Sequence, residues 1–130
     1  MLYSQAAKLI EKAMTFERAG HSLKLDSNTK KTNPVIYTVA GDLMLAANQI
    51  EAAQALYANA YLGLKARLLE STISGVLPQS IKSHEILFKA IRKKPQISSV
   101  PDSELEEIAA RYSQETLNQY VKSAIKHHKL

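Results

Sequence analysis

Apolar residues recur at three- and four-residue spacing along most of this 130-residue chain, which is the period of helices that bury one face. Alternation of apolar and polar residues, the pattern of half-buried strands, is nowhere sustained over five residues of the sequence. The pattern therefore predicts an all-α protein. The segments that carry the helical period are 2–19, 34–47, 49–70, 79–93 and 102–127.

The third of these segments is apolar around most of its circumference between Ala52 and Glu70. Leucine and tyrosine side chains are expected on two of its sides, with alanine and glycine between them. Such a helix belongs in the middle of a bundle. Gly63 costs a helix about 1 kcal/mol relative to alanine, and we interpret it as a point of close approach between helices. The sequence predicts one domain over residues 1–130, a bundle of about five helices around a buried central helix.

Short polar stretches and prolines separate the helical segments. Asn48, followed by Glu51 three residues later, resembles a capping box at the start of the central helix, and the tight turn there predicts an antiparallel helical hairpin with segment 34–47. Val35 is expected to face the core from that segment. Residues 94–101, KPQISSVP, are interpreted as a linker.

The amino-acid composition indicates the class of protein, but it says little about the function. A hydrophobic content of 45% with 22% charged residues is typical of a folded globular chain. The sequence has no cysteine, which excludes disulfides and thiolate zinc sites and favours a cytoplasmic location. It also has no apolar run long enough to cross a bilayer. Because no catalytic or metal-binding spacing of side chains is visible, we predict no enzyme, no metal ion and no cofactor.

The net charge of +5 permits an anionic partner such as RNA without demanding one, since modest positive charge also serves solubility. Cations gather in segment 79–93 and at the ends of segments 79–93 and 102–127, where they also complement helix dipoles. If these ends converge in the fold, they form a basic patch able to contact phosphates. Its members would be Lys82, Lys89, Arg92, Lys93, Lys94, Lys122, Lys126 and Lys129.

Three polar residues stand out at expected core positions. His84 is predicted on the inward face of segment 79–93, from which it can hydrogen-bond Asn59 or Arg67 of the central helix. Asn59 and Arg67 are about two helical turns apart, so they share one side of that helix. This stripe can bind a phosphate or a carboxylate, or it can fix the register of the packed helices. We favour the structural interpretation for all three residues.

Tyr57, Tyr61 and Lys65 form a second stripe at four-residue spacing. Tyrosines beside a lysine can stack on the unpaired bases of RNA. Helical tyrosines are more often core residues whose hydroxyl groups reach the rim of the core, and we favour that interpretation.

The stretch from Asn48 to Ile91 resembles the core of HEPN-type helical domains, especially archaeal members of unknown role. The resemblance covers about half the chain, and it consists of a helical hairpin, a glycine and proline break and a following helix that starts with a Ser-His pair. The matching residues are Ala53, Tyr57, Ala60, Lys65 and Ala66, then Gly75 and Pro78, then Ser83, His84, Glu85, Ile86 and Leu87.

HEPN domains that act as metal-independent ribonucleases carry an arginine followed four to six residues later by a histidine, and no arginine of this chain is so placed. The resemblance therefore implies a non-catalytic member that binds RNA, a nucleotide or a protein partner, often as a homodimer. Ala53, Tyr57 and Ala60 are also similar to helices of tetratricopeptide repeats and MIT domains. That second resemblance implies a module that binds proteins or helical peptides.

Overall fold

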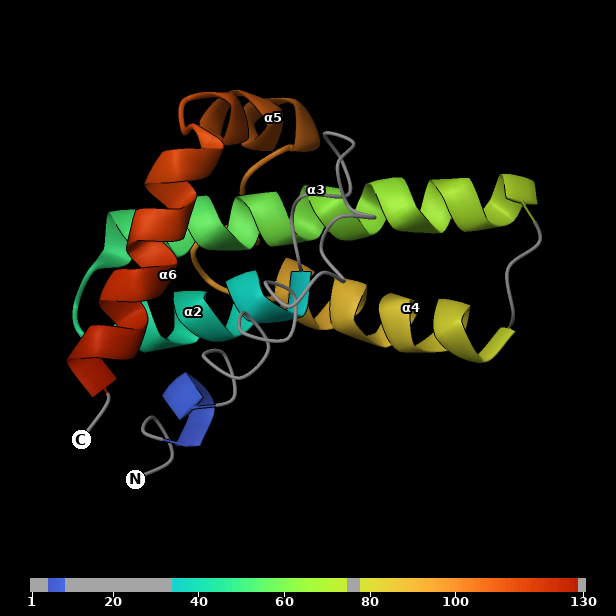
Figure 1. Cartoon of the computed structure of the whole chain (residues 1–130). Helices are drawn as coiled ribbons and strands as arrows, with labels where there is room; N and C mark the ends of the chain where they lie inside the picture. Colours follow the sequence, from blue (N-terminus) through green and yellow to red (C-terminus); the bar gives the residue numbers. More distant parts are fainter. Residues whose placement is uncertain (1–4, 9–33, 75–77, 129–130) are drawn as a thin grey trace.

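Figure 1 shows the computed structural model of the chain, which describes residues 5–8, 34–74 and 78–128. The described part is helical and contains no strand, so the predicted all-α class is confirmed. Of the expected helix 2–19, residues 5–8 are helical and the remainder lies outside the described residues. The longer helices are α2 (Pro34–Ala46), α3 (Ile50–Ser74), α4 (Pro78–Arg92), α5 (Asp102–Ala110) and α6 (Gln114–His128).

The predicted central helix is α3, which packs against α2, α4, α5 and α6 (Figure 1). Between Ala52 and Leu64 almost every side chain is buried because neighbouring helices surround this stretch. The C-terminal part of α3 extends beyond α2 and α5 and runs beside α4. Leu69 in that part is 66% exposed, so the prediction that the whole of 52–70 is buried is wrong for its last turns.

The α2 and α3 helices form the antiparallel hairpin that the sequence predicts (Figure 1). Gly41 of α2 lies against the Tyr57 ring of α3. A Cβ atom on Gly41 would lie 2.5 Å from Cε1 of the Tyr57 ring, a distance at which atoms overlap. A glycine at this point therefore lets the tyrosine ring lie directly against the α2 backbone. The sequence interpretation had assigned the close approach to Gly63, which is also buried.

The turn between α2 and α3 stabilises the end of α2 and does not cap α3. Asn48 has a φ angle of 62°, in the left-handed region that asparagine tolerates better than most residues. The amide of Gln49 donates to the carbonyl oxygen of Met44 at 2.8 Å, a bond typical of a Schellman motif. The predicted capping box at Asn48 is therefore wrong. Glu51 instead accepts a hydrogen bond from the hydroxyl group of Tyr112 at 3.2 Å.

The predicted last helix, 102–127, is two helices, α5 and α6. Ser113 lies between them, and its Oγ atom accepts a hydrogen bond from the amide of Thr116 at 3.1 Å, as an N-cap residue does. The break changes the helical phase. Leu117 is consequently buried, whereas one continuous helix in the phase of Ile108 would place Thr116 on the core face.

Two further expectations about the core are wrong. Val35 is 58% exposed, because α2 turns the next side chains, Ile36 and Tyr37, toward the core. Residues 94–101 are not a linker, since Ile97 is fully buried and Gln54 of α3 donates to the backbone carbonyl oxygen of Gln96 at 3.0 Å. Within the described residues, no helix is long and apolar enough to cross a membrane.

Candidate functional site

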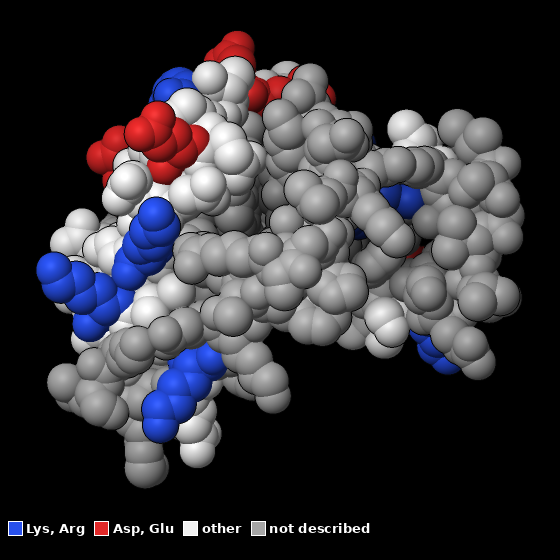
Figure 2. All heavy atoms as spheres, viewed as in Figure 1, with Lys and Arg blue, Asp and Glu red and all other residues white. Residues whose placement is uncertain are grey.

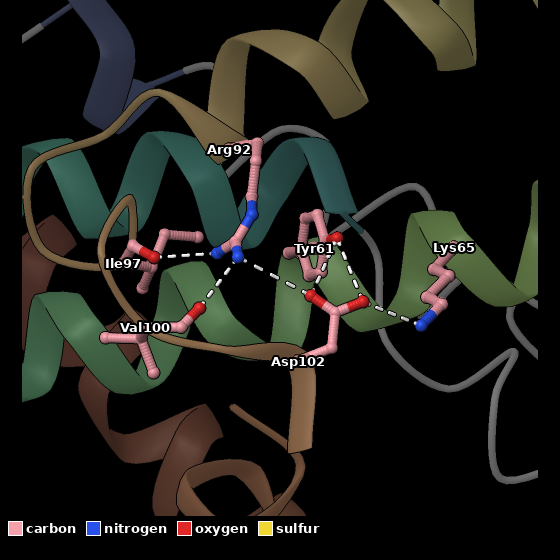
Figure 3. A network of polar contacts seen from close by, with 6 residues as sticks. All are labelled: Tyr61, Lys65, Arg92, Ile97, Val100 and Asp102. Carbon is pink, nitrogen blue, oxygen red and sulfur yellow. Dashed lines mark hydrogen bonds and ion pairs between the residues drawn. The ribbon is translucent and has the colours of Figure 1, made fainter. Parts of the chain in front are cut away.

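Asp102, in the first turn of α5, joins three helices through its carboxylate (Figure 3). Lys65 of α3 places its Nζ atom 2.8 Å from Oδ2, and Tyr61, one turn earlier, donates its hydroxyl hydrogen to the carboxylate at 3.1 Å. Arg92, the last residue of α4, completes an ion pair at 3.6 Å. We name these four residues the Asp102 cluster.

Arg92 also fixes the segment that connects α4 to α5 (Figure 3). Its two terminal nitrogens donate to the carbonyl oxygens of Ile97 and Val100, each at 2.7 Å. Its guanidinium carbon lies 5.1 Å from the centroid of the Tyr61 ring, whose other neighbour, Phe88, stacks at 4.6 Å. A planar guanidinium group suits this position, because its fixed fork reaches two carbonyl oxygens while it stacks on a ring.

The charges of the Asp102 cluster reinforce one another. The hydrogen bond from Lys65 lowers the pKa of Asp102, and the same bond raises the pKa of Lys65. Burial raises the pKa of Tyr61, and its bond to the Asp102 carboxylate raises that pKa further. At neutral pH the three groups therefore stay in one protonation state each.

A smaller cluster of the same kind joins α2, α3 and the segment after α4. The hydroxyl group of Tyr57 donates to Oδ1 of Asp42, and Nζ of Lys94 lies 2.9 Å from the same oxygen. The Lys94 ammonium group also lies 5.5 Å from the centroid of the Tyr57 ring. Asp42 thus holds the hydroxyl end of the buried Tyr57 and pairs with a cation from a distant part of the chain.

The tyrosine stripe predicted from the sequence lies inside these two clusters. Tyr57 is fully buried and Tyr61 is 5% exposed, so neither ring offers a face on which a base can stack. Lys65 is exposed but pairs with Asp102. The placement agrees with the core interpretation of the stripe and removes the stacking surface that RNA recognition would use.

Asn59, Arg67 and His84 do not assemble into a polar site. Asn59 donates to the carbonyl oxygen of Ala55 at 2.8 Å, and Arg67 donates to that of Gly63 at 3.1 Å, so both side chains bond their own helix. The Nδ1 atom of His84 is shielded from solvent and has no hydrogen-bond partner. The hydrogen bond that we expected from His84 to Asn59 or Arg67 is therefore not formed at this nitrogen.

The predicted basic patch separates into three groups. Arg92 and Lys94 are paired with Asp102 and Asp42. The α4 helix packs on α3 below its C-terminal half in Figure 1, whereas α6 lies near the N-terminal end of α3. The chain after α4 and the end of α6 both reach α2, where Lys94 pairs with Asp42 and Nε2 of His128 lies 2.9 Å from the carbonyl oxygen of Leu43. Figure 2 shows basic side chains near α6 and acidic side chains over α5. The exposed lysines are Lys82, Lys89 and Lys93 of the α4 region and Lys122 and Lys126 of α6, and Lys129 lies outside the described residues.

The sequence interpretation missed the two carboxylates that organise these clusters. Asp42 is a lone charge within the apolar segment PVIYTVAGDLMLA, and a charge there signals a partner from elsewhere in the fold. Asp102 lies with Glu104 in the first turn of its helix, where compensation of the helix dipole alone accounts for an acidic residue. Neither position reveals its partner, because Lys94 is 52 residues from Asp42 and Lys65 is 37 residues from Asp102.

No group of three or more histidine or acidic side chains in the described part of the chain is arranged to hold a metal ion. No protein-family model, curated protein or solved structure matches this chain. The resemblance to HEPN-type, MIT and tetratricopeptide helices therefore stays a prediction.

Proposed function

We propose that this protein is a non-catalytic helical binding module that acts through a macromolecular partner. The observation that carries the proposal is the distribution of the cations of the α4 region. Arg92 and Lys94 are paired inside the fold, whereas Lys82, Lys89 and Lys93 are exposed and join no ion pair within the described residues. The outer side of α4 thus holds charge that pairs with no carboxylate in the described part of the chain.

The polar interior supports a binding role over a catalytic one. Each charged member of the Asp102 and Asp42 clusters already has a partner of opposite charge. His84, the candidate with the most chemical interest, has a shielded Nδ1 atom without the oriented partner that a general base requires. A non-catalytic HEPN-like domain that binds RNA or a protein fits this description, as does a protein-binding helical module.

An activity assay tests the non-catalytic part of the proposal. Labelled single-stranded RNA incubated with the full chain is expected to remain intact, with and without added Mg²⁺. A matched preparation of His84→Ala controls for contaminating nucleases. Cleavage by the wild type that disappears in His84→Ala would contradict the proposal.

A binding comparison tests the surface. The wild type, Lys82→Glu/Lys89→Glu on α4 and Lys122→Glu/Lys126→Glu on α6 are immobilised and exposed to an extract of the native host, and retained molecules are quantified. The two variants change the net charge equally, so they differ only in where the charge is reversed. We expect a partner retained by the wild type and by the α6 variant and lost from the α4 variant. Equal retention by all three proteins would show that α4 is not the binding surface.

A further inference from the structure

The outer side of α4 carries two lysines with one isoleucine between them, and a third lysine follows directly after the helix. Lys82, Ile86 and Lys89 follow one another at spacings of four and three residues, which brings them to one side of α4, and Lys93 comes four residues later in the turn after Arg92. All four are exposed, and Ile86 is 64% exposed. We name this row the lysine stripe.

The lysine stripe has no partner within the described residues. The helix that α4 packs against is α3, and the side chains that face it include the buried Ile91 and the half-buried Phe88. Glu85 is exposed beside the stripe and forms no ion pair with Lys82 or Lys89. The stripe therefore presents positive charge to solvent along twelve residues of chain, from Lys82 in α4 to Lys93 directly after it.

We propose that the lysine stripe docks an acidic helix of a partner protein, with Ile86 as the apolar contact near its centre. The inference rests on the proposed binding function and specifies the partner. A helix that carries carboxylates with the same spacing and one apolar residue between them complements the stripe in charge and in polarity.

Two observations favour a protein over RNA as this partner. RNA recognition without base stacking depends on phosphate contacts alone, and both tyrosines of the predicted stacking stripe are buried. An exposed isoleucine adds nothing to a phosphate contact, but it gains free energy when an apolar side chain covers it. A single exposed apolar residue is ordinary on a surface. Its position among three unpaired lysines is what gives it a role in binding.

The interaction is expected to be moderate and sensitive to salt. Exposed ion pairs contribute little each and are screened by salt, so the charges mainly steer the partner and set its register. Ile86 supplies the contact that persists when the charges are screened. Reversal of two lysines is therefore expected to weaken binding at least about tenfold at low salt, and less at high salt.

The test uses the full chain and a synthetic helical peptide that carries glutamates at positions 1, 8 and 12 and a leucine at position 5, matching the lysine stripe. A peptide of the same composition with these positions scrambled is the control, and binding is measured by fluorescence anisotropy. The wild type is expected to bind the patterned peptide at least about tenfold more tightly than the scrambled one. Lys82→Glu/Lys89→Glu and Ile86→Ser should each lose this preference, and Lys122→Glu/Lys126→Glu should keep it.

A reversed peptide with lysines at positions 1, 8 and 12 provides a gain-of-binding test. It should bind Lys82→Glu/Lys89→Glu more tightly than it binds the wild type, which a variant that merely failed to fold would not do. Circular dichroism of each variant checks that the helices remain.

Single-stranded poly(U) RNA is the competing probe. RNA binding that is lost in Lys82→Glu/Lys89→Glu and unchanged in Ile86→Ser would overturn the acidic-helix inference while the proposed binding function stands. Equal binding of the patterned and scrambled peptides would also overturn it. The proposed function is contradicted by a different result. In that result, the host extract yields no partner that binds the α6 variant and not the α4 variant.

Discussion

The α4 region carries two sets of cations, one paired within the fold and one exposed to water. Arg92 and Lys94 turn inward and meet Asp102 and Asp42, whereas the lysine stripe faces water. The two sets are neighbours in the chain, and Lys93 of the outer set stands between the two inner cations. The difference shows that charge type and sequence position do not decide which cations hold the fold. A carboxylate or a carbonyl oxygen within reach decides it.

The two sets of cations differ in how far they are exposed to solvent. Arg92 donates to two backbone carbonyl oxygens in a half-buried position, where loss of the donor leaves acceptors without their partner. An exposed lysine keeps its water shell, and its removal costs the fold little. Variants of the two sets should therefore differ clearly in their free energy of unfolding.

Replacement of Arg92 by alanine should lower the free energy of unfolding by about 2–3 kcal/mol, since the carbonyl oxygens of Ile97 and Val100 and the Asp102 carboxylate all lose a donor. Urea denaturation followed by circular dichroism measures this change. Arg92→Lys is the matched control and should recover only part of the loss, because one ammonium group cannot bond both carbonyl oxygens. If Arg92→Ala lowered the free energy of unfolding no more than replacement of an exposed lysine does, the two sets of cations would not differ in their contribution to stability.

Replacement of Asp42 by alanine should cost about 1–2 kcal/mol, because the buried Tyr57 hydroxyl group loses its carboxylate acceptor and Lys94 loses its ion pair. The double variant Asp42→Ala/Tyr57→Phe removes both partners of the hydrogen bond. It should be more stable than Asp42→Ala alone, and a double-mutant cycle on unfolding free energies measures the coupling. Strict additivity of the two single changes would mean that the hydrogen bond contributes nothing.

Replacement of Asp102 by asparagine should cost about 1 kcal/mol at neutral pH, a small value because Lys65 and Asp102 are more than one-third exposed. The folded pKa of Asp102 lies below its ordinary value of 3.8, so the ionised carboxylate stabilises the fold at pH values above 3.8. That contribution is lost as the pH falls through the lower, folded pKa. Denaturation curves of both proteins against pH should converge in acid. A difference that persists unchanged in acid would assign the effect to packing.

Replacement of Lys89 by alanine should change the free energy of unfolding by no more than about 0.5 kcal/mol, because its charge is exposed and unpaired within the described residues. The same denaturation measurement applies. Lys93→Ala should behave alike, although Lys93 lies directly after Arg92. A loss near that of Arg92→Ala would show that the lysine stripe belongs to the fold and is not reserved for a partner.

Particular elements show how far the sequence determined this fold. Helical spacing predicts the starts of α2, α3 and α4 to within one residue, because an apolar face and a nearby proline or turn are local signals. The division between α5 and α6 escaped the prediction, since the serine that caps α6 carries no glycine or proline beside it. Asn48 was placed at the right turn with the wrong role, because asparagine suits both an N-cap and a left-handed C-terminal position.

The contacts of the candidate site, in contrast to the helices, depended mainly on tertiary packing. The tyrosines at four-residue spacing were visible in the sequence, but their burial depends on which helices cover α3. Two members of the expected basic patch, Arg92 and Lys94, pair instead with Asp102 and Asp42, and no local pattern encodes those partners.

The sequence by itself determined that the chain is helical and that α3 lies at the centre, because a helix apolar on most sides must be surrounded. The tertiary structure alone decided which glycine meets an aromatic ring, which carboxylate meets which cation and which lysines remain in water. These contacts join residues that are 10 to 52 positions apart, and they form only where packing brings the helices together. The sequence contains seventeen lysines and arginines. Only the tertiary structure shows that Lys65, Arg92 and Lys94 pair with carboxylates of the fold.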